Sequence, residues 1–99
     1  MPSILINGVP MEQVSVLDRG FQYGDGVFET LQVVGGQPQY WSRHMARLQK
    51  GCERLGISTP DVECLRAESE SLCADFGDIE RCVLKITVTR GVGGRGYGV

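Results

Sequence analysis

The sequence predicts an α+β domain in which a mostly antiparallel sheet carries two helices on one face. Alternating apolar and polar residues indicate strands at 27–34 and 81–91, and apolar residues spaced three or four apart indicate helices between 41 and 76. Strands at both ends of the chain with helices between them are typical of α+β domains. Ninety-nine residues, 41% of them hydrophobic, are enough for one core and too few for two.

The N-terminal part of the chain predicts two hairpins. ILINGVP (4–10) is a short strand that enters an Asn-Gly turn, a pair that accepts positive φ, and MEQVSV (11–16) is expected to close the hairpin. The alternating run from Val27 to Val34 is the next strand, Gly35-Gly36 is its turn, and QPQYW (37–41) returns antiparallel. These short segments supply the first strands of the sheet.

Two helices are expected to follow. Apolar residues recur at helical spacing over 41–55, with Ser42 as the expected N-cap and Gly56 as the stop. A second helix is expected to begin at Thr59-Pro60, with acidic residues in its first turn, and to end before Gly77. The last strand then closes the domain.

The long strands have an apolar side and a polar side. The polar side carries Phe28, Thr30 and Gln32 of one strand and Lys85, Thr87 and Thr89 of the other. The opposite side is apolar apart from Glu29, so the helices should cover it. The polar face is then either solvated or a cleft beneath a second domain or subunit. A cleft is the preferred interpretation, because charged glycine-rich loops lie at both ends of this face.

Composition and charge narrow the possible partners. A formal net charge of −2 with interspersed signs provides no basic field, so nucleic acid and anionic membranes are not expected partners. The four cysteines lack metal-binding spacing, no metal is expected, and they are interpreted as small buried hydrophobes. The N-terminus lacks the features of a signal peptide or membrane span, which favours the reducing cytoplasm.

Two residues on the first long helix are candidates for binding an anion. His44 and Arg47 lie beside the apolar stripe, on the same flank as Gly51, where another backbone or a ligand could approach closely. The planar guanidinium of Arg47 suits a phosphate or a carboxylate. The alternatives are a surface arginine paired with Glu53 or solvent, and a histidine bonded to a backbone carbonyl.

The end of the chain is a glycine-rich loop, TRGVGGRGYGV (89–99). It is expected to present Arg95 and Tyr97 to an acidic substrate, and the alternative is a mobile hairpin tip. Because no element follows to receive this loop, the chain is expected to be a fragment of a longer protein. The alternative is a frayed terminus.

Three motifs resemble, in order and spacing, the N-terminal domain of the fold-type IV pyridoxal-phosphate enzymes. They are DRGFQYGDGVFET (18–30), HMARL (44–48) and VLKITVTRGVGGRGY (83–97). That family includes D-amino-acid and branched-chain aminotransferases and 4-amino-4-deoxychorismate lyases, and the third motif is most similar to the lyases. The resemblance implies that residues 1–99 are the N-terminal α+β domain of a two-domain enzyme whose C-terminal domain is absent from this chain.

The resemblance also implies roles for individual residues. Arg47 would bind the phosphate of pyridoxal 5'-phosphate, supported by His44, and the charged groups of the 18–25 loop would hold that loop in place. The residues expected to contact substrate are Phe28, Thr30, Lys85, Arg95 and Tyr97. The Schiff-base lysine is expected beyond Val99, so no catalytic residue is assigned within this chain and the chain alone should be inactive.

The activity implied is the elimination of pyruvate from 4-amino-4-deoxychorismate, which gives 4-aminobenzoate for folate biosynthesis. The substrate is a small molecule with carboxylates, and the intact enzyme is expected to be a cytoplasmic homodimer. Two alternatives stay open: a D-amino-acid or branched-chain aminotransferase of the same fold, and a non-catalytic anion-binding module.

Overall fold

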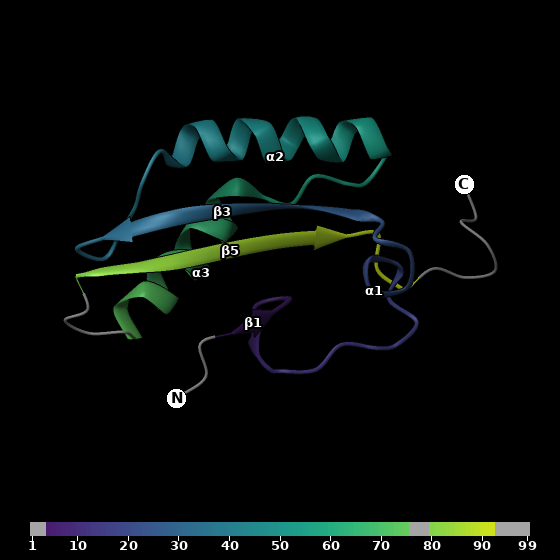
Figure 1. The fold of residues 1–99 in the computed structure, drawn as a ribbon, viewed down its shortest axis with the longest axis horizontal. Helices are drawn as coiled ribbons and strands as arrows, with labels where there is room; N and C mark the ends of the chain where they lie inside the picture. Colours follow the sequence, from purple (N-terminus) through teal and green to yellow (C-terminus); the bar gives the residue numbers. More distant parts are fainter. Residues whose placement is uncertain (1–3, 76–79, 93–99) are drawn as a thin grey trace.

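A computed structural model of the chain describes residues 4–75, without the side chain of Asp75, and residues 80–92 (Figure 1). The described helices and strands are, in chain order, β1 (Leu5–Ile6), β2 (Val9–Pro10), α1 (Arg19–Tyr23), β3 (Gly26–Val34), β4 (Gln37–Pro38), α2 (Trp41–Leu55), α3 (Val62–Asp75) and β5 (Arg81–Thr89). The predicted α+β class is confirmed. The order of the long elements is also the predicted one.

The main sheet has the order β4-β3-β5, and both pairings are antiparallel. β3 and β5 pair along their full length, from Gly26 opposite Thr89 to Val34 opposite Arg81. β1 and β2 form a separate two-stranded hairpin, and Gly8 in its turn lies close to the carboxylate of Glu68 on α3. The long β3–β5 ladder is therefore the scaffold on which the candidate side chains are placed.

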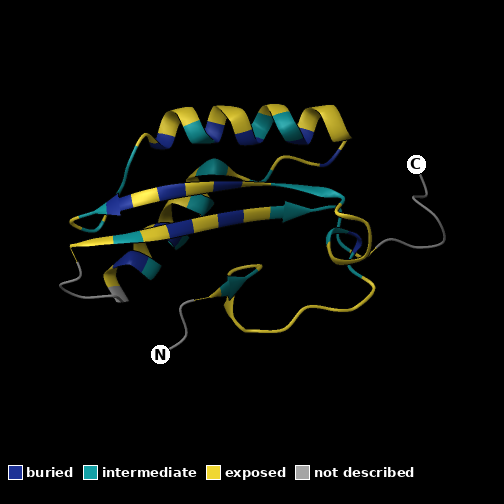
Figure 2. Cartoon of the chain, in the orientation of Figure 1, coloured by how far each residue is buried: buried dark blue, intermediate teal, exposed yellow. Residues whose placement is uncertain are grey.

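Both long helices pack on one face of this sheet, as the sequence predicts. The buried cluster joins side chains from β3, β5, α2 and α3, namely Leu31, Val33, Leu84, Ile86, Trp41, Met45, Leu48 and Cys73. Figure 2 shows the resulting alternation of buried and exposed positions along β3 and β5. Period-2 alternation on both strands places one face in the core and leaves the other open.

The open face of the sheet carries both polar and apolar side chains. Its exposed members on β3 and β5 are Phe28, Thr30, Gln32, Arg81, Val83, Lys85 and Thr87. Phe28 and Val83 are 60% and 63% exposed, although both are large hydrophobic residues. The polar face predicted from the alternation is therefore present, with two apolar residues among its members.

The helix boundaries differ from the prediction at both N-termini. α2 begins at Trp41 after Tyr40, which adopts a left-handed conformation with φ 56° and makes no side-chain cap, so Ser42 lies inside the helix. α3 begins at Val62 because the Asp61 carboxylate accepts hydrogen bonds from the backbone N–H groups of Glu63 and Cys64, at 2.8 and 3.3 Å. An aspartate is a strong cap, and it moves the start two residues beyond Pro60.

Two further sequence expectations are wrong. The strand that closes the first hairpin is only Val9–Pro10; the Met11 N–H still donates to the Ile4 carbonyl at 3.3 Å, but residues 11–16 form no strand. Of the four cysteines, Cys52 and Cys73 are buried, which raises the pKa of both thiols, but Cys64 is exposed on α3. All four are free thiols.

Candidate functional site

A charged cluster lies between β3 and α2, on the face of the sheet that the helices cover. The carboxylate of Glu29 is 5% exposed and is contacted by two side chains from α2. Nδ1 of His44 lies 2.6 Å from Oε1 of Glu29. Nε of Arg47 donates to Oε1 at 3.1 Å and to Oε2 at 2.9 Å, and its Nη2 donates to Oε1 at 2.8 Å. Residues three apart on a helix share a flank, which is why both α2 side chains reach one carboxylate.

The contacts determine the charge state of the cluster. The hydrogen bond from Arg47 lowers the pKa of Glu29 below its ordinary 4.5, against the opposing effect of burial and with a further lowering by His44. The same hydrogen bond raises the pKa of Arg47. Glu29 is therefore ionised and Arg47 charged at neutral pH.

The lowered pKa of Glu29 predicts how stability depends on pH. Its folded pKa lies below 4.5, so the unfolded chain binds more protons in this range, and the stabilisation by Glu29 is lost as the pH falls through the folded value. We expect Glu29→Gln to lower the free energy of unfolding by about 1–3 kcal/mol at neutral pH. The difference from wild type should shrink at acidic pH, as measured by urea denaturation at several pH values. A difference independent of pH would contradict this prediction.

The partner of Arg47 and His44 is neither of those weighed from the sequence. Arg47 pairs with Glu29 rather than with Glu53, and His44 contacts the same carboxylate rather than a backbone carbonyl. The sequence shows Glu29 only as a polar residue that interrupts an apolar strand face. Glu29 is 15 and 18 residues away from His44 and Arg47 in the sequence, so no local spacing indicates that they are in contact.

Gly51 has a structural role in the approach of α2 to the sheet. A Cβ at this position would lie 2.9 Å from Cγ1 of Val27 on β3. The missing side chain therefore makes room for β3. Of the two possibilities that the sequence left open at Gly51, the close approach of another part of the chain is the one observed, rather than that of a ligand.

The other candidates gather on the open face. Nζ of Lys85 lies 4.6 Å from the centroid of the Phe28 ring, a cation–π contact across the two strands. The β3–β5 register places Thr30 opposite Lys85 and Thr87 opposite Phe28. An ammonium beside two threonine hydroxyls and an aromatic ring is an arrangement that can receive a carboxylate.

The sequence-predicted site residues therefore form two groups. His44 and Arg47 meet at Glu29 on the covered face, whereas Phe28, Thr30 and Lys85 lie on the open face. The sheet separates the two groups, whereas the family resemblance assigns both to one active site. Arg95 and Tyr97 lie outside the described residues.

The loop that precedes β3 is attached to the end of β5. Oδ2 of Asp18 caps α1 by accepting the Phe21 N–H at 3.1 Å, and its Oδ1 accepts the Thr89 hydroxyl at 2.8 Å. Asp25 accepts Nε of Arg90 at 2.6 Å. The sequence predicts that Asp18, Arg19 and Asp25 hold this loop by local hydrogen bonds; the Asp18 cap of α1 is local, but the bonds to Thr89 and Arg90 span 71 and 65 residues of sequence.

The same attachment reaches α2 and fixes the chain after β5. Nη2 of Arg90 donates to the Leu55 carbonyl at 2.5 Å, at the C-terminus of α2 where a cation is favourable. The Arg19 N–H donates to the Gly91 carbonyl at 2.9 Å. The chain that follows β5 is therefore hydrogen-bonded to α2 through Arg90 and to α1 through Gly91. The sequence did not indicate helix α1 or the contact of Arg90 with α2.

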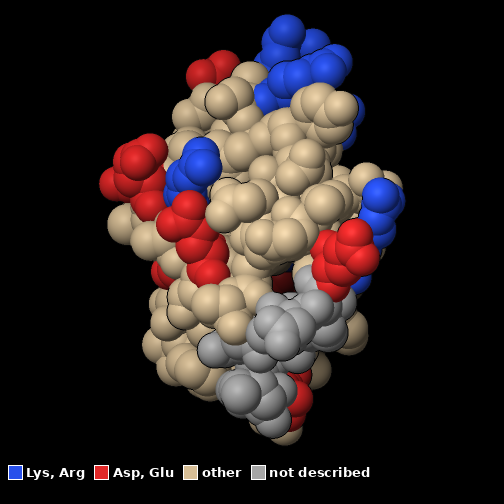
Figure 3. Space-filling view, turned by 90° about the vertical axis from the view of Figure 1, so that its left-hand side faces the viewer, with Lys and Arg blue, Asp and Glu red and all other residues tan. Residues whose placement is uncertain are grey.

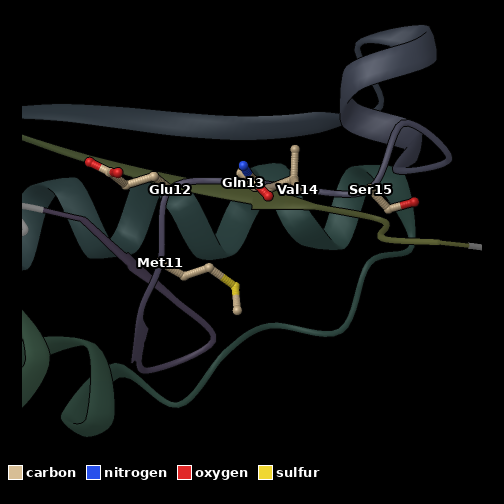
Figure 4. Close-up of a pocket in the computed structure, with 5 residues that line it drawn as sticks. All are labelled: Met11, Glu12, Gln13, Val14 and Ser15. Carbon is tan, nitrogen blue, oxygen red and sulfur yellow. The ribbon is translucent and has the colours of Figure 1, made fainter.

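One hollow of the described structure contains none of the candidate residues. Its volume is about 450 Å³, and Met11 to Ser15 line it (Figure 4). A smaller hollow of about 190 Å³ lies at the Val34–Arg81 end of the β3–β5 ladder. Lys85 lines neither of these two hollows.

Charges of both signs are scattered over the face of the molecule drawn in Figure 3. Figure 3 shows basic side chains gathered at the end over α2, with acidic groups on either side of the face below. Within residues 4–75 and 80–92, no group of three or more His, Cys, Asp or Glu residues is arranged to hold a metal ion. No helix of this described part combines the length and apolar character needed to cross a bilayer.

Residues 26–99 match the family model described as amino-transferase class IV. The chain belongs to this family. Among curated relatives it is 38% identical over 92 residues to an aminodeoxychorismate lyase of Vibrio harveyi, a match that covers 93% of this chain and 33% of that protein. It is 36% identical over 95 residues to a D-alanine aminotransferase of Bacillus licheniformis, covering 89% of the chain and 32% of the relative.

Solved structures of family members show the same fold. The crystal structure of 4-amino-4-deoxychorismate lyase from Pseudomonas aeruginosa superposes with a TM-score of 0.80 at 50% identity, covering 93% of this chain and 33% of that one. A fold IV-transaminase from Curtobacterium pusillum gives 0.79 at 35% identity, covering 88% and 31%. A PLP-bound hypothetical aminotransferase from Mycobacterium tuberculosis gives 0.79 at 26% identity, covering 86% and 31%. The class IV chain thus spans about a third of the length of these relatives.

Proposed function

We propose that this chain is the N-terminal domain of a two-domain, pyridoxal-phosphate-dependent lyase that acts on 4-amino-4-deoxychorismate. The lyase would release pyruvate and 4-aminobenzoate, a step toward folate. The observation that carries the proposal is the 50% identity with the Pseudomonas aeruginosa lyase structure, against 35% with the Curtobacterium pusillum transaminase over a similar share of the chain. Of the two curated relatives compared above, the aminodeoxychorismate lyase also has the higher identity, 38% against 36% for the D-alanine aminotransferase.

Arg47 suits the phosphate of pyridoxal 5'-phosphate. Its guanidinium is charged and is held from one side by Glu29, and the side chain as a whole is 72% exposed. A fixed, planar, exposed guanidinium is a receptor for a phosphate dianion. When bound, the cofactor supplies an electron sink for the substrate carbon that carries nitrogen.

The substrate of such a lyase carries carboxylates, and the open face offers a cation for one of them. Lys85 is exposed there, its ammonium is placed by the Phe28 ring, and Thr30 lies opposite on β3. We assign Phe28, Thr30 and Lys85 to substrate binding, together with Arg95 and Tyr97. Because Arg47 lies on the other side of the β3–β5 ladder, the proposed site includes residues from both faces of the sheet. The lysine that holds the cofactor covalently is assigned to a part of the protein beyond Val99, and a cytoplasmic homodimer is the proposed intact enzyme.

The proposal is tested by supplying full-length protein and pyridoxal phosphate with 4-amino-4-deoxychorismate and no keto acid. We expect stoichiometric pyruvate and 4-aminobenzoate, with pyruvate followed by a coupled dehydrogenase. A transaminase would instead need a keto-acid acceptor. Transamination is the second candidate activity, because this chain is also similar to the D-alanine aminotransferase of Bacillus licheniformis. The 99-residue chain alone should release no pyruvate. Full-length protein that binds no cofactor would favour the non-catalytic anion-binding module.

The role of Lys85 can be tested separately. We expect Lys85→Met in the full-length enzyme to raise KM for 4-amino-4-deoxychorismate roughly tenfold while the cofactor stays bound, because a charge-assisted contact with a carboxylate is lost. Steady-state kinetics and the cofactor absorbance measure the two effects. Lys50→Met, an exposed substitution on α2, is the control. An unchanged KM in Lys85→Met would rule out the contact.

A further inference from the structure

The carboxylate of Glu29 occupies a position where an apolar side chain would be expected. It lies on the covered face of β3 between Val27 and Leu31, opposite Ile86 of β5. Burying a carboxylate is unfavourable unless it is paired, and a well-packed apolar residue is often as stable or more stable at such a site. Packing alone therefore does not account for an acidic residue here.

The bonds of Glu29 occupy one edge of the Arg47 guanidinium. They use Nε and one N–H of Nη2, which form the side-on fork. They leave the end-on edge, which consists of Nη1 and the second N–H of Nη2. Because the side chain is 72% exposed, this outer edge is available to an anion.

His44 restrains the carboxylate from a second direction. Its Nδ1 contacts Oε1 at 2.6 Å, and the His44 side chain is only 18% exposed. Oε1 is therefore shared between the imidazole and the guanidinium, whereas Oε2 accepts from Nε of Arg47. Rotation of the carboxylate would break contacts with both partners. An exposed arginine that would otherwise sample many rotamers is held in a single orientation.

We propose that Glu29 is a positioning residue, which holds the guanidinium of Arg47 by one edge so that the opposite edge receives the phosphate of pyridoxal 5'-phosphate. The inference rests on the proposed function, because it assumes that cofactor. The negative charge of Glu29 opposes anion binding, so its contribution must be geometric. By orienting Arg47, Glu29 would strengthen phosphate binding, whereas its negative charge would weaken it. A single substitution of Glu29 can show which of the two effects is larger.

Glu29→Gln removes the charge and keeps a similar volume. If orientation dominates, the loss of the bidentate pair weakens phosphate binding. If net charge dominates, the more positive cluster binds phosphate more tightly. The direction of the change in phosphate affinity therefore decides between the two.

The experiment compares pyridoxal phosphate with pyridoxal, which lacks the phosphate, by absorbance titration of the full-length apoprotein. For Glu29→Gln we expect roughly tenfold weaker binding of pyridoxal phosphate and less than about a twofold change for pyridoxal. Glu53→Gln, which removes an exposed carboxylate of α2, should change neither affinity. Tighter binding of pyridoxal phosphate by Glu29→Gln, or equal losses for the two ligands, would overturn the inference.

Failure of the proposed function gives a different result from failure of this inference, because it is seen already in the wild-type protein. Wild-type protein that binds pyridoxal phosphate no better than pyridoxal would remove the phosphate site itself, and the inference with it. If Glu29→Gln does not fold, the Nε–H signal of Arg47 in wild-type protein provides the test. We expect slow solvent exchange of this proton in the apoprotein and a shift on adding inorganic phosphate. Fast exchange in the apoprotein would overturn the positioning role.

Discussion

Arg47→Ala is expected to weaken binding of pyridoxal phosphate to the full-length protein by roughly ten- to a hundredfold. The substitution removes a charged fork whose outer edge is the proposed phosphate contact, and it also leaves Glu29 with one fewer donor. The affinity is measured by titrating apoprotein with the cofactor and following its absorbance. Binding of pyridoxal should change much less, because pyridoxal lacks the group that Arg47 contacts.

Lys50→Ala is the matched control for this experiment. Lys50 is also cationic and also exposed on α2, one turn further along the helix. Substitution at position 50 therefore lowers the net charge by the same amount without touching the Glu29 cluster. Equal losses of affinity in the two variants would show that only overall charge matters, and Arg47 would then have no specific phosphate role.

Alternation along the long strands was sufficient to predict which face of the sheet is covered. Leu31 and Leu84 are buried on the covered face, while Thr30 and Lys85 are exposed on the other, because successive strand residues point to opposite faces. The helical period over Trp41–Leu55 likewise identified α2 and the flank that carries Arg47. These periodicities depend only on residues close together in the sequence, so the faces of β3, β5 and α2 could be predicted without knowing the tertiary structure.

Contacts that join distant segments could not be obtained in this way. Which carboxylate Arg47 meets depends on how α2 crosses β3, and the sequence marks Glu29 only as an exception to the apolar pattern. The attachment of Arg90 to Asp25 spans 65 residues of sequence. Helix α1 has only five residues, too few to show a period, and its ends depend on the Asp18 cap and the left-handed Gly24. Long-range charge pairing and short capped turns are decided by tertiary structure.

Gly20 and Gly26 allow this part of the chain to approach β5 closely, and Gly26→Ala tests that role. A Cβ at Gly26 would lie 2.5 Å from the Val88 carbonyl oxygen and 3.1 Å from the Thr89 Cα, both of them backbone atoms. The overlap can be relieved only by moving β3 away from β5. We expect the free energy of unfolding to fall by about 2–3 kcal/mol, measured by urea denaturation.

Gly36→Ala separates this steric cost from the general cost of replacing glycine. Gly36 has a positive φ of 79° and open space where the Cβ would be, so its substitution should cost about 1 kcal/mol of backbone strain. Gly26 shows no positive φ, so a larger loss there must come from the contact with β5. Because Thr89 and Arg90 also bond to the loop through Asp18 and Asp25, separating the strands at Gly26 would loosen those bonds together. Equal losses in the two variants would mean that the strands adjust easily and that the close approach at Gly26 is not what holds the loop against β5.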